Sequence, residues 1–288
     1  MNRNGSISAT KRKPSGAGIP RTIAVIGSKG RMGAMLAGRL GAAGHAVTGV
    51  DRTQRAPGPP ALDPDELAQA LGTSDFVLLA VPVTAFPEVL KLAAPCLNPR
   101  QVLFDIASIK GTALRCMEAR HPGPVVGAHP LFGPQPQPAD LRVALVPGRR
   151  ADEDACRAVE ALFTDIGCTC FRVTAEEHDR NVGLIQSLNF AGSAAYLAQA
   201  ARSADTRFFT PSFRRRMESA RALLTDDAAM FGEFSAANPC FAEILTEYAD
   251  TLRGITACEN DRETPTAGIR KRLADLALQA AGIYNDTT

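Results

Sequence analysis

Two groups of residues in this sequence have the types and spacing for chemistry on a small molecule. The first is a turn over 27–33 that holds three glycines within seven residues. The second is a pair of polar residues, Ser108 and His129, each of which follows an apolar run of strand type. A neutral imidazole can accept a proton from a substrate hydroxyl while hydride leaves the same carbon. From its position alone, His129 is either such a base or a histidine satisfied within a loop.

The glycine turn lies where a dinucleotide would bind. It follows a β-branched apolar run over 21–27 and precedes a helical stretch over 34–43, and a second strand over 45–50 ends at an acid. Gly30 allows the backbone to approach a pyrophosphate, and Gly33 allows helix and strand to pack closely. Ser28 stands where the G-x-G-x-x-G pattern has its first glycine, and it is small enough for the turn to form. The residues predicted to bind the cofactor are Gly27, Ser28, Lys29, Gly30, Arg31, Met32, Gly33, Asp51, Val81 and Pro82.

Asp51 closes the second strand and predicts which dinucleotide binds. Its carboxylate can accept hydrogen bonds from both ribose hydroxyls of an adenosine and would repel a 2′-phosphate. This favours NAD. Arg52 follows directly and is able to bind a phosphate, so NADP is the alternative.

The strand and helix patterns alternate through residue 173. Further strands are predicted over 74–81, 101–105, 124–128, 141–146 and 168–173, with helices over 63–71, 87–97, 113–120 and 152–166. Such alternation is typical of an α/β fold with a doubly wound, mostly parallel sheet of the Rossmann type. Ligands bind beyond the carboxyl ends of the strands in these sheets, so Ser108 and His129 are expected at the same edge as the glycine turn.

The character changes to helical from Thr174. A capping box over 174–177 starts a helix that is predicted to reach residue 201, about 42 Å long. A helix of that length suits an intersubunit core, and Val182, Ile185, Leu188 and Tyr196 are expected to be buried. Further helices are predicted over 212–224, 228–237, 240–258 and 265–280. The predicted organisation is a disordered leader (1–20), an α/β domain (21–173) and an all-α dimerisation domain (174–288).

Composition excludes several classes of protein. The formal net charge of the 288 residues is +2, and five basic residues lie within the first 21, so the remainder is slightly acidic. This argues against a nucleic-acid partner, and no apolar run approaches the roughly 18 residues of a membrane span. Seven cysteines without regular spacing predict reduced thiols in a cytoplasmic protein. Cys168 and Cys170 have no second pair nearby, so no metal site is expected.

Four segments occur in the order and spacing of prephenate dehydrogenases, a family that this chain resembles over about residues 21–250. They are the turn 27–33, Asp-Ile-Ala-Ser-Ile-Lys-Gly over 105–111, His-Pro-Leu-Phe-Gly-Pro over 129–134, and Glu-His-Asp over 177–179. The resemblance implies a Rossmann domain followed by a helical domain that forms a homodimer. It also implies oxidative decarboxylation of prephenate to 4-hydroxyphenylpyruvate with NAD, in tyrosine biosynthesis.

The resemblance also implies roles for individual residues. His129 would accept the proton of the substrate's C4 hydroxyl, and Ser108 would orient that hydroxyl and the nicotinamide. Lys110 would lie near the cofactor or the substrate carboxylate. His178 would either contact the substrate or cap its helix.

Two departures from the family pattern affect substrate binding. Family histidines are missing from 186–190, and the position of the family's substrate-binding arginine holds Ala222. A guanidinium binds a carboxylate through two hydrogen bonds, so the neighbouring Arg221 is predicted to bind substrate, with Arg214 on the same helix face as the second choice. A solvated face is the other interpretation of these arginines.

Three functions stay open at this stage. Prephenate dehydrogenase leads, and arogenate dehydrogenase, with NAD or NADP, differs only in the side chain of the substrate. The third is a cofactor-binding regulatory protein without turnover. A β-hydroxyacid dehydrogenase would be expected to use a lysine on the long helix, and no residue from 174 to 201 is lysine.

Overall fold

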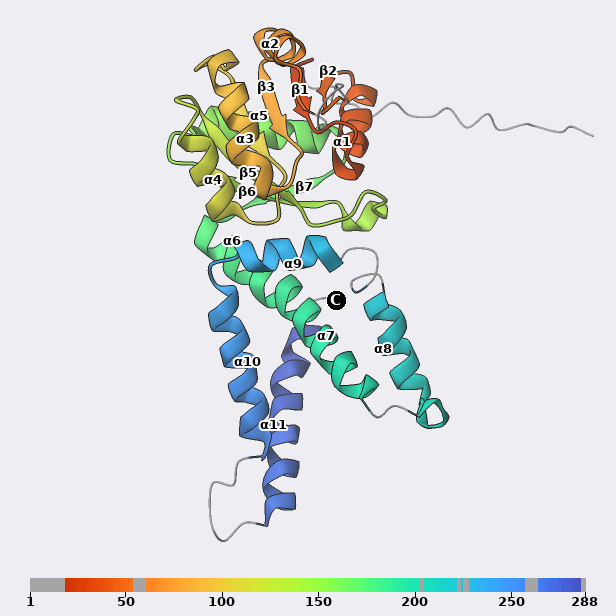
Figure 1. The fold of residues 1–288 in the computed structure, drawn as a ribbon. Coiled ribbons are helices and arrows are strands. Elements are labelled where there is room, and N and C mark those ends of the chain that lie inside the picture. Colours follow the sequence, from red (N-terminus) through yellow and green to blue (C-terminus); the bar gives the residue numbers. More distant parts are fainter. Residues whose placement is uncertain are drawn as a thin grey trace, which may run out of the picture. The chain divides into compact units, whose positions relative to one another are not determined.

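The computed structural model describes residues 19–53, 61–202, 205–221, 224, 228–256 and 264–285. Residues 1–18 of the predicted leader lie outside these ranges. The chain divides into two compact units, Met1–Asp179 and Arg180–Thr288, which are considered separately below (Figure 1).

The first unit is built on a seven-stranded sheet with the order β2-β1-β3-β4-β5-β6-β7. All neighbouring strands are parallel except β5 and β6, which are antiparallel. The strands are β1 (Thr22–Ile26), β2 (Ala46–Val50), β3 (Phe76–Leu79), β4 (Val102–Asp105), β5 (Val125–Pro130), β6 (Arg142–Pro147) and β7 (Thr169–Arg172).

Helices cover both faces of this sheet (Figure 1). The first unit contains α1 (Arg31–Ala42), α2 (Pro64–Gly72), α3 (Phe86–Ala93), α4 (Lys110–Glu118) and α5 (Glu153–Asp165). Successive residues of β1 enter different cores, because side chains alternate across a strand. Ile23 packs with apolar residues of α1 and α5, and Ala24 packs with those of α2, α3 and α4. The predicted doubly wound, mostly parallel sheet is therefore confirmed.

The chain crosses from one side of β1 to the other between β2 and β3, and this creates the crevice in which such sheets bind ligands. Gly27 ends β1 with φ of +92°, and a Cβ there would lie 2.5 Å from the carbonyl oxygen of Ala80. A Cβ on Gly33 would collide with the carbonyl oxygen of Gly27. Both positions therefore require glycine, one for its backbone angle and both for the close approach.

The long helix predicted over 174–201 is present but contains an interruption. It consists of α6 (Ala175–Val182), a π-helical turn (Gly183–Ser187) and α7 (Leu188–Ala201). The division between the units falls inside α6, so His178 and Asp179 are part of the first unit. The π turn was not predicted, because one wider turn leaves the helical spacing of apolar residues nearly unchanged.

The second unit also contains α8 (Pro211–Arg221), α9 (Ala228–Ala237), α10 (Phe241–Thr256) and α11 (Pro265–Asn285). Helices α10 and α11 lie side by side (Figure 1). Gly183 in the π turn allows α10 to come close, since a Cβ there would lie 2.5 Å from Ile244 Cδ1. Phe190 stacks on Phe231 with ring centroids 5.4 Å apart.

Burial along the long helix differs from the prediction. Val182 is buried and Leu188 is half-buried, but Ile185 is 69% exposed and Tyr196 is 41% exposed. The expectation that these four residues form a core within one chain is therefore wrong for Ile185 and Tyr196. Ile185 lies in the π turn and Tyr196 in α7, and no residue of α7 is fully buried by the described part of this single chain.

Candidate active site

Helix α4 takes its N-terminal cap from a distant residue. Its own N-cap residue, Ile109, has no side chain that can accept a hydrogen bond. Instead, the carboxylate of Asp179 accepts from both of the first two backbone N–H groups, with Oδ1 2.8 Å from Lys110 N and Oδ2 2.9 Å from Gly111 N. A carboxylate at a helix N-terminus is favoured by the unpaired N–H groups and by the helix dipole. A Cβ on Gly111 would lie 3.0 Å from Asp179 Oδ2, so glycine leaves room for this cap.

The same carboxylate begins a chain of hydrogen bonds that ends at His129. Asp179 Oδ1 lies 2.8 Å from Nδ1 of His178, and Nε2 of His178 lies 2.9 Å from Nδ1 of His129. All three side chains are buried. Burial raises the pKa of Asp179, but hydrogen bonds from His178 and from the two backbone N–H groups outweigh it, and the pKa lies below its usual value. Asp179 is therefore ionised at neutral pH and can only accept hydrogen bonds.

The hydrogen bonds assign the tautomers of both histidines. Nδ1 of His178 must carry a proton to donate to Asp179, which leaves a lone pair on Nε2 of a neutral His178. Nδ1 of His129 then donates to that lone pair, so Nε2 of His129 is unprotonated. Burial, together with repulsion from His178 and Lys110, holds the pKa of His129 well below 6.5, so its ring is neutral. Nε2 of His129 has no hydrogen-bond partner among the described residues, and it is a proton acceptor.

Two other predicted site residues, His178 and Lys110, have side chains that are bonded within the protein. His178 was expected to contact the substrate or cap its helix, but both of its ring nitrogens are already hydrogen-bonded. Lys110 was expected near the cofactor or the substrate carboxylate, but its side chain is completely buried. Its Nζ donates to Asp105 Oδ2 and to the carbonyl oxygen of Ala128, at 2.6 Å each.

Lys110 and Asp105 therefore form a buried ion pair that joins α4 to β4 and β5. Burial raises the pKa of Asp105 and lowers that of Lys110, and the attraction between the two charges opposes both effects. The backbone N–H of Ala107 donates to the same oxygen of Asp105 over 2.8 Å. Gly127 makes room for the lysine stem, since a Cβ there would lie 2.9 Å from Lys110 Cδ. Two residues of the Asp-x-x-Ser-x-Lys motif thus hold the loop that carries its serine.

Ser108 and His129 are positioned by two neighbouring parallel strands, β4 and β5. Asp105, the last residue of β4, is paired with Gly127 of β5. Ser108 is half-buried in the loop after β4, and its hydroxyl has no hydrogen-bond partner in the described part of the chain. His129 was expected just past a strand but lies inside β5, which is two residues longer because His129 pairs with Ala144 of the antiparallel β6.

The glycine turn lies at the same carboxyl edge and has the features of an anion site. Gly30 is the N-cap of α1 and makes no side-chain cap, and the first turn of α1 has no acidic residue. Phosphates bind favourably to such a helix N-terminus. Val81 and Pro82 follow β3 beside the turn, and Val81 Cγ1 would lie 2.8 Å from a Cβ on Gly27.

Ser28 has a role that the glycine it replaces would not have. Its hydroxyl donates to Asp51 Oδ2 over 2.5 Å, and the backbone N–H of Lys29 donates to the same oxygen over 3.0 Å. These bonds hold the Asp51 side chain against the turn through one oxygen. Gly49 lies opposite, where a Cβ would collide with the Ser28 hydroxyl, so the two residues are matched.

Arg214 and Arg221 lie on α8 in the second unit and are exposed. The guanidinium of Arg214 lies 5.7 Å from the ring centroid of Phe209. Arg221 is the last residue of α8, and Ala222 lies outside the described residues. Their role in substrate binding stays a prediction.

The other two histidines, His121 and His45, pack within the first unit. His121 is buried and lies 2.9 Å from the carbonyl oxygen of Gln101, and His45 is buried with Nε2 3.3 Å from Asp165 Oδ2. Sequence reasoning did not assign Asp105 or Asp179 to the site. The Glu-His-Asp motif over 177–179 was the available signal, but it does not show which residues the motif meets.

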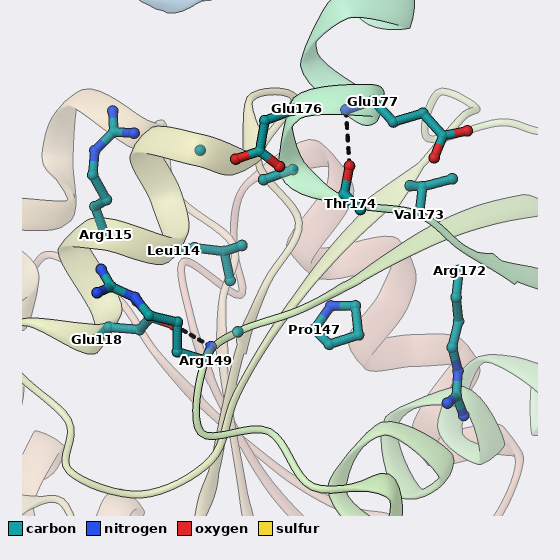
Figure 2. Close-up of a pocket in the computed structure, with 13 residues that line it drawn as sticks. Leu114, Arg115, Glu118, Pro147, Arg149, Arg172, Val173, Thr174, Glu176 and Glu177 are labelled. Carbon is teal, nitrogen blue, oxygen red and sulfur yellow. Dashed lines mark hydrogen bonds and ion pairs between the residues drawn. The ribbon is translucent and has the colours of Figure 1, made fainter.

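A pocket of about 790 Å³ in the first unit does not contain the predicted site residues (Figure 2). Its charged groups are largely paired with one another or with neighbours. Arg149 donates to Glu118 through its backbone N–H and Nε, and Thr174 caps α6 by accepting from Glu177 N over 3.1 Å. Arg172 at its edge is bonded to Glu153 and Glu160.

The described ranges hold no group of three or more His, Cys, Asp or Glu residues placed to bind a metal ion. None of their helices is both long enough and apolar enough to cross a membrane. The six described cysteines are free thiols, and burial raises the pKa of Cys168 to about 11 and that of Cys170 to about 12.

The sheet order, the glycine turn and the acid after β2 define a Rossmann-type nucleotide-binding protein. A family model described as "Prephenate dehydrogenase, nucleotide-binding domain" matches residues 36–171. The T-protein of Enterobacter agglomerans is 26% identical over 233 residues, which cover 79% of this chain and 60% of that protein. The comparisons thus indicate the prephenate dehydrogenase family, as the motifs do. The chain spans only 46–60% of the length of the curated relatives it matches.

Solved structures confirm the fold. A prephenate dehydrogenase from A. aeolicus, in complex with hydroxyphenyl propionate and NAD+, matches with a TM-score of 0.68 and 18% identity, covering 91% of this chain and 98% of that one. The Synechocystis arogenate dehydrogenase matches with a TM-score of 0.69 and 19% identity, covering 92% and 99%. Identity at this level shows the fold, a Rossmann-like domain followed by helices, and nothing finer.

The buried position of Lys110 generates a prediction about stability. Replacing it by methionine leaves the Asp105 carboxylate buried without its cation, so the free energy of unfolding should fall by about 3–5 kcal/mol in denaturant titrations. The double variant Asp105→Leu/Lys110→Met should regain most of this loss. Lys91→Met, the same change on the exposed face of α3, should alter stability by less than about 0.5 kcal/mol. If Lys110→Met instead has normal stability and a raised KM for the substrate, the result would support a role of Lys110 in substrate binding.

Proposed function

We propose that this protein is an NAD-dependent dehydrogenase that converts prephenate to 4-hydroxyphenylpyruvate by oxidative decarboxylation, in tyrosine biosynthesis. The observation that carries the proposal is that Nε2 of His129, a residue of β5 at the carboxyl edge of a nucleotide-binding sheet, has no hydrogen-bond partner in the described part of the chain, while Nδ1 is bonded to His178. The four motifs that match the family, and relatives that bear its name, support the choice of reaction.

The residues of this chain would share the work as follows. The N-terminus of α1 and its glycine turn would bind the dinucleotide phosphates, and Asp51 would accept hydrogen bonds from the ribose. The bound nicotinamide supplies a hydride acceptor. Nε2 of His129 would take the proton of the substrate's C4 hydroxyl, and the free hydroxyl of Ser108 would orient that group. Loss of CO₂ from the ring makes the product aromatic and requires no second base.

The substrate carries two carboxylates, so its site needs cations. Because Lys110 is bound to Asp105, the proposed binding groups are Arg221 and, second, Arg214. A guanidinium can hold a carboxylate through two parallel hydrogen bonds.

Arogenate dehydrogenase is the second candidate. Relatives with this activity in their names are among the matches, and the family histidines are missing from 186–190. Parallel assays of NADH formation with prephenate and with arogenate separate the two, and we expect the faster turnover with prephenate. Absence of turnover with both substrates would instead support the regulatory, cofactor-binding protein.

Replacing His129 by asparagine tests its role as the base. The variant should bind NAD normally, since no turn residue is changed, and kcat should fall by about 10²–10⁴-fold. NADH absorbance gives the rate, and fluorescence titration gives the affinity for NAD. His121→Asn, the same change at a buried histidine elsewhere, should keep the wild-type kcat. Near-normal turnover in His129→Asn would contradict the proposal.

Asp51 is proposed to set the preference for NAD. Asp51→Asn removes the charge that repels a 2′-phosphate and should lower the ratio of kcat/KM for NAD over NADP by about tenfold or more. Ser28→Ala frees the Asp51 side chain and should raise the KM for NAD with little change in kcat. Asp75→Asn is the control. Asp75 also accepts a hydrogen bond from a backbone N–H, that of Thr22, but it directly precedes β3 and so lies at the amino edge of the sheet, opposite the glycine turn. A wild-type enzyme that prefers NADP would contradict the assignment.

The helical unit is proposed to form a homodimer. Many of its large apolar side chains are exposed in the single chain, which is unusual for a surface that stays in water. They include Leu184, Ile185, Phe208, Leu252, Leu273 and Leu278.

Light scattering should give twice the chain mass of 30.5 kDa. Ile185→Glu should weaken the dimer, because a charge would enter its apolar interface. Leu92→Glu, at an exposed apolar position of the first unit, should not weaken it. A monomer at micromolar concentration would overturn the proposal.

A further inference from the structure

Asp179, His178 and His129 form one hydrogen-bonded chain, and the proposed reaction uses only its last member. We propose that His178 and Asp179 are positioning residues that together fix the tautomer of His129, and that His178 receives the positive charge after His129 accepts a proton. The proposal rests on the proposed function of His129 as the base, but its central claim concerns a proton position that is measurable without turnover.

The carboxylate of Asp179, at one end of this hydrogen-bonded series, has a fixed position. It accepts from Lys110 N and Gly111 N, which are the first two backbone donors of α4. Helix α4 is itself held to β4 and β5 by the bonds of Lys110 to Asp105 and to the carbonyl of Ala128. Asp179 therefore cannot turn away from His178 without leaving two backbone N–H groups unpaired.

The fixed carboxylate decides where the protons lie. Without it, His178 could carry its proton on Nε2 and donate to Nδ1 of His129, which would then hold its own proton on Nε2. In that tautomer Nε2 of His129 could not accept a proton from a substrate. An acid that orients a histidine base in this way supports catalysis by selecting the correct tautomer.

The hydrogen bond between His129 and His178 can also move positive charge away from His129. When Nε2 of His129 takes the substrate proton, its ring holds two protons and a positive charge. The Nδ1–H bond of His129 can then break as an Nε2–H bond forms on His178 across 2.9 Å. His129 becomes neutral again, and the cation lies on His178, whose Nδ1 is 2.8 Å from Asp179. The proton returns by the reverse transfer, and Nε2 of His129 gives it back to the ring oxygen of the product, which is formed as a phenolate and leaves as 4-hydroxyphenylpyruvate.

The charges around His129 within the first unit favour this transfer. Lys110 on α4 is a nearby cation that, with burial, disfavours a cationic His129. Asp105 on β4 is bonded to Lys110, and attraction between its carboxylate and a charged His178 also favours the cation on His178. Asp179 on α6 is the anion that faces His178.

Nitrogen NMR of the histidine rings tests the tautomer in the protein without ligands. In the wild-type chain we expect the ring proton of His129 on Nδ1 and none on Nε2. In His178→Phe, which removes the acceptor, this preference should disappear, and kcat should fall by about 10²–10⁴-fold. In His178→Gln, whose amide oxygen can still accept but cannot take the charge, the tautomer should remain and kcat should fall by about tenfold.

The pH profile tests the charge transfer. His129 must be unprotonated to act as a base, and its pKa lies well below 6.5. As the pH is lowered, kcat/KM of the wild-type enzyme should therefore stay level through pH 6.5 and fall only at a pH well below it. Asp179→Asn removes the anion that stabilises the cation, so this acid limb should shift to lower pH while kcat falls. His45→Gln is the matched control, because His45 is a buried histidine beside an aspartate, Asp165, at the amino end of β2. It should leave tautomer, kcat and pH profile unchanged.

Each outcome decides one of the two proposals. A wild-type His129 with its proton on Nε2 overturns the positioning role, even if every variant fails to fold. The same follows if His178→Phe loses turnover with an unchanged tautomer, because its effect is then merely structural. Full turnover in His129→Asn would instead overturn the proposed function, whatever tautomer NMR finds.

Discussion

The carboxylate of Asp179 is the group on which the arrangement of the site depends. It caps α4, which has an apolar residue at its own N-cap, and it orients His178 and through it His129. One anion thus provides a helix cap and a histidine partner. Its charge is stabilised by two backbone N–H groups that cannot leave, which is why a buried carboxylate can stay ionised there.

The buried pair of Lys110 and Asp105 provides the support behind this group. It ties the start of α4 to the ends of β4 and β5, the strands that lead to Ser108 and His129. A buried ion pair contributes little net stability when compared with apolar residues of the same size, but it permits few alternative arrangements. In this protein it specifies where the N-terminus of α4 lies, and so where Asp179 can bind.

The cofactor edge shows the same dependence on local partners. Ser28 departs from the glycine pattern, yet its hydroxyl bonds to the acid that the pattern places after β2. Ser28 in turn requires glycine at position 49, because a Cβ there would collide with the serine side chain. Ser28, which departs from the glycine pattern in the sequence, thus makes a polar contact with Asp51 in the fold.

Local patterns in the sequence are enough to predict the elements and their order. Periodicity, β-branched runs and capping residues act within a few residues, so they located the strands and helices of both units, the glycine turn and the edge that carries Ser108 and His129. The long-range partners of the charged groups are visible only in the folded protein. Asp179 meets the first backbone N–H of α4, 69 residues away, and His178 meets His129, 49 residues away. No local pattern encodes such pairs, because they form only when strands and helices that are distant in the chain are brought together by packing.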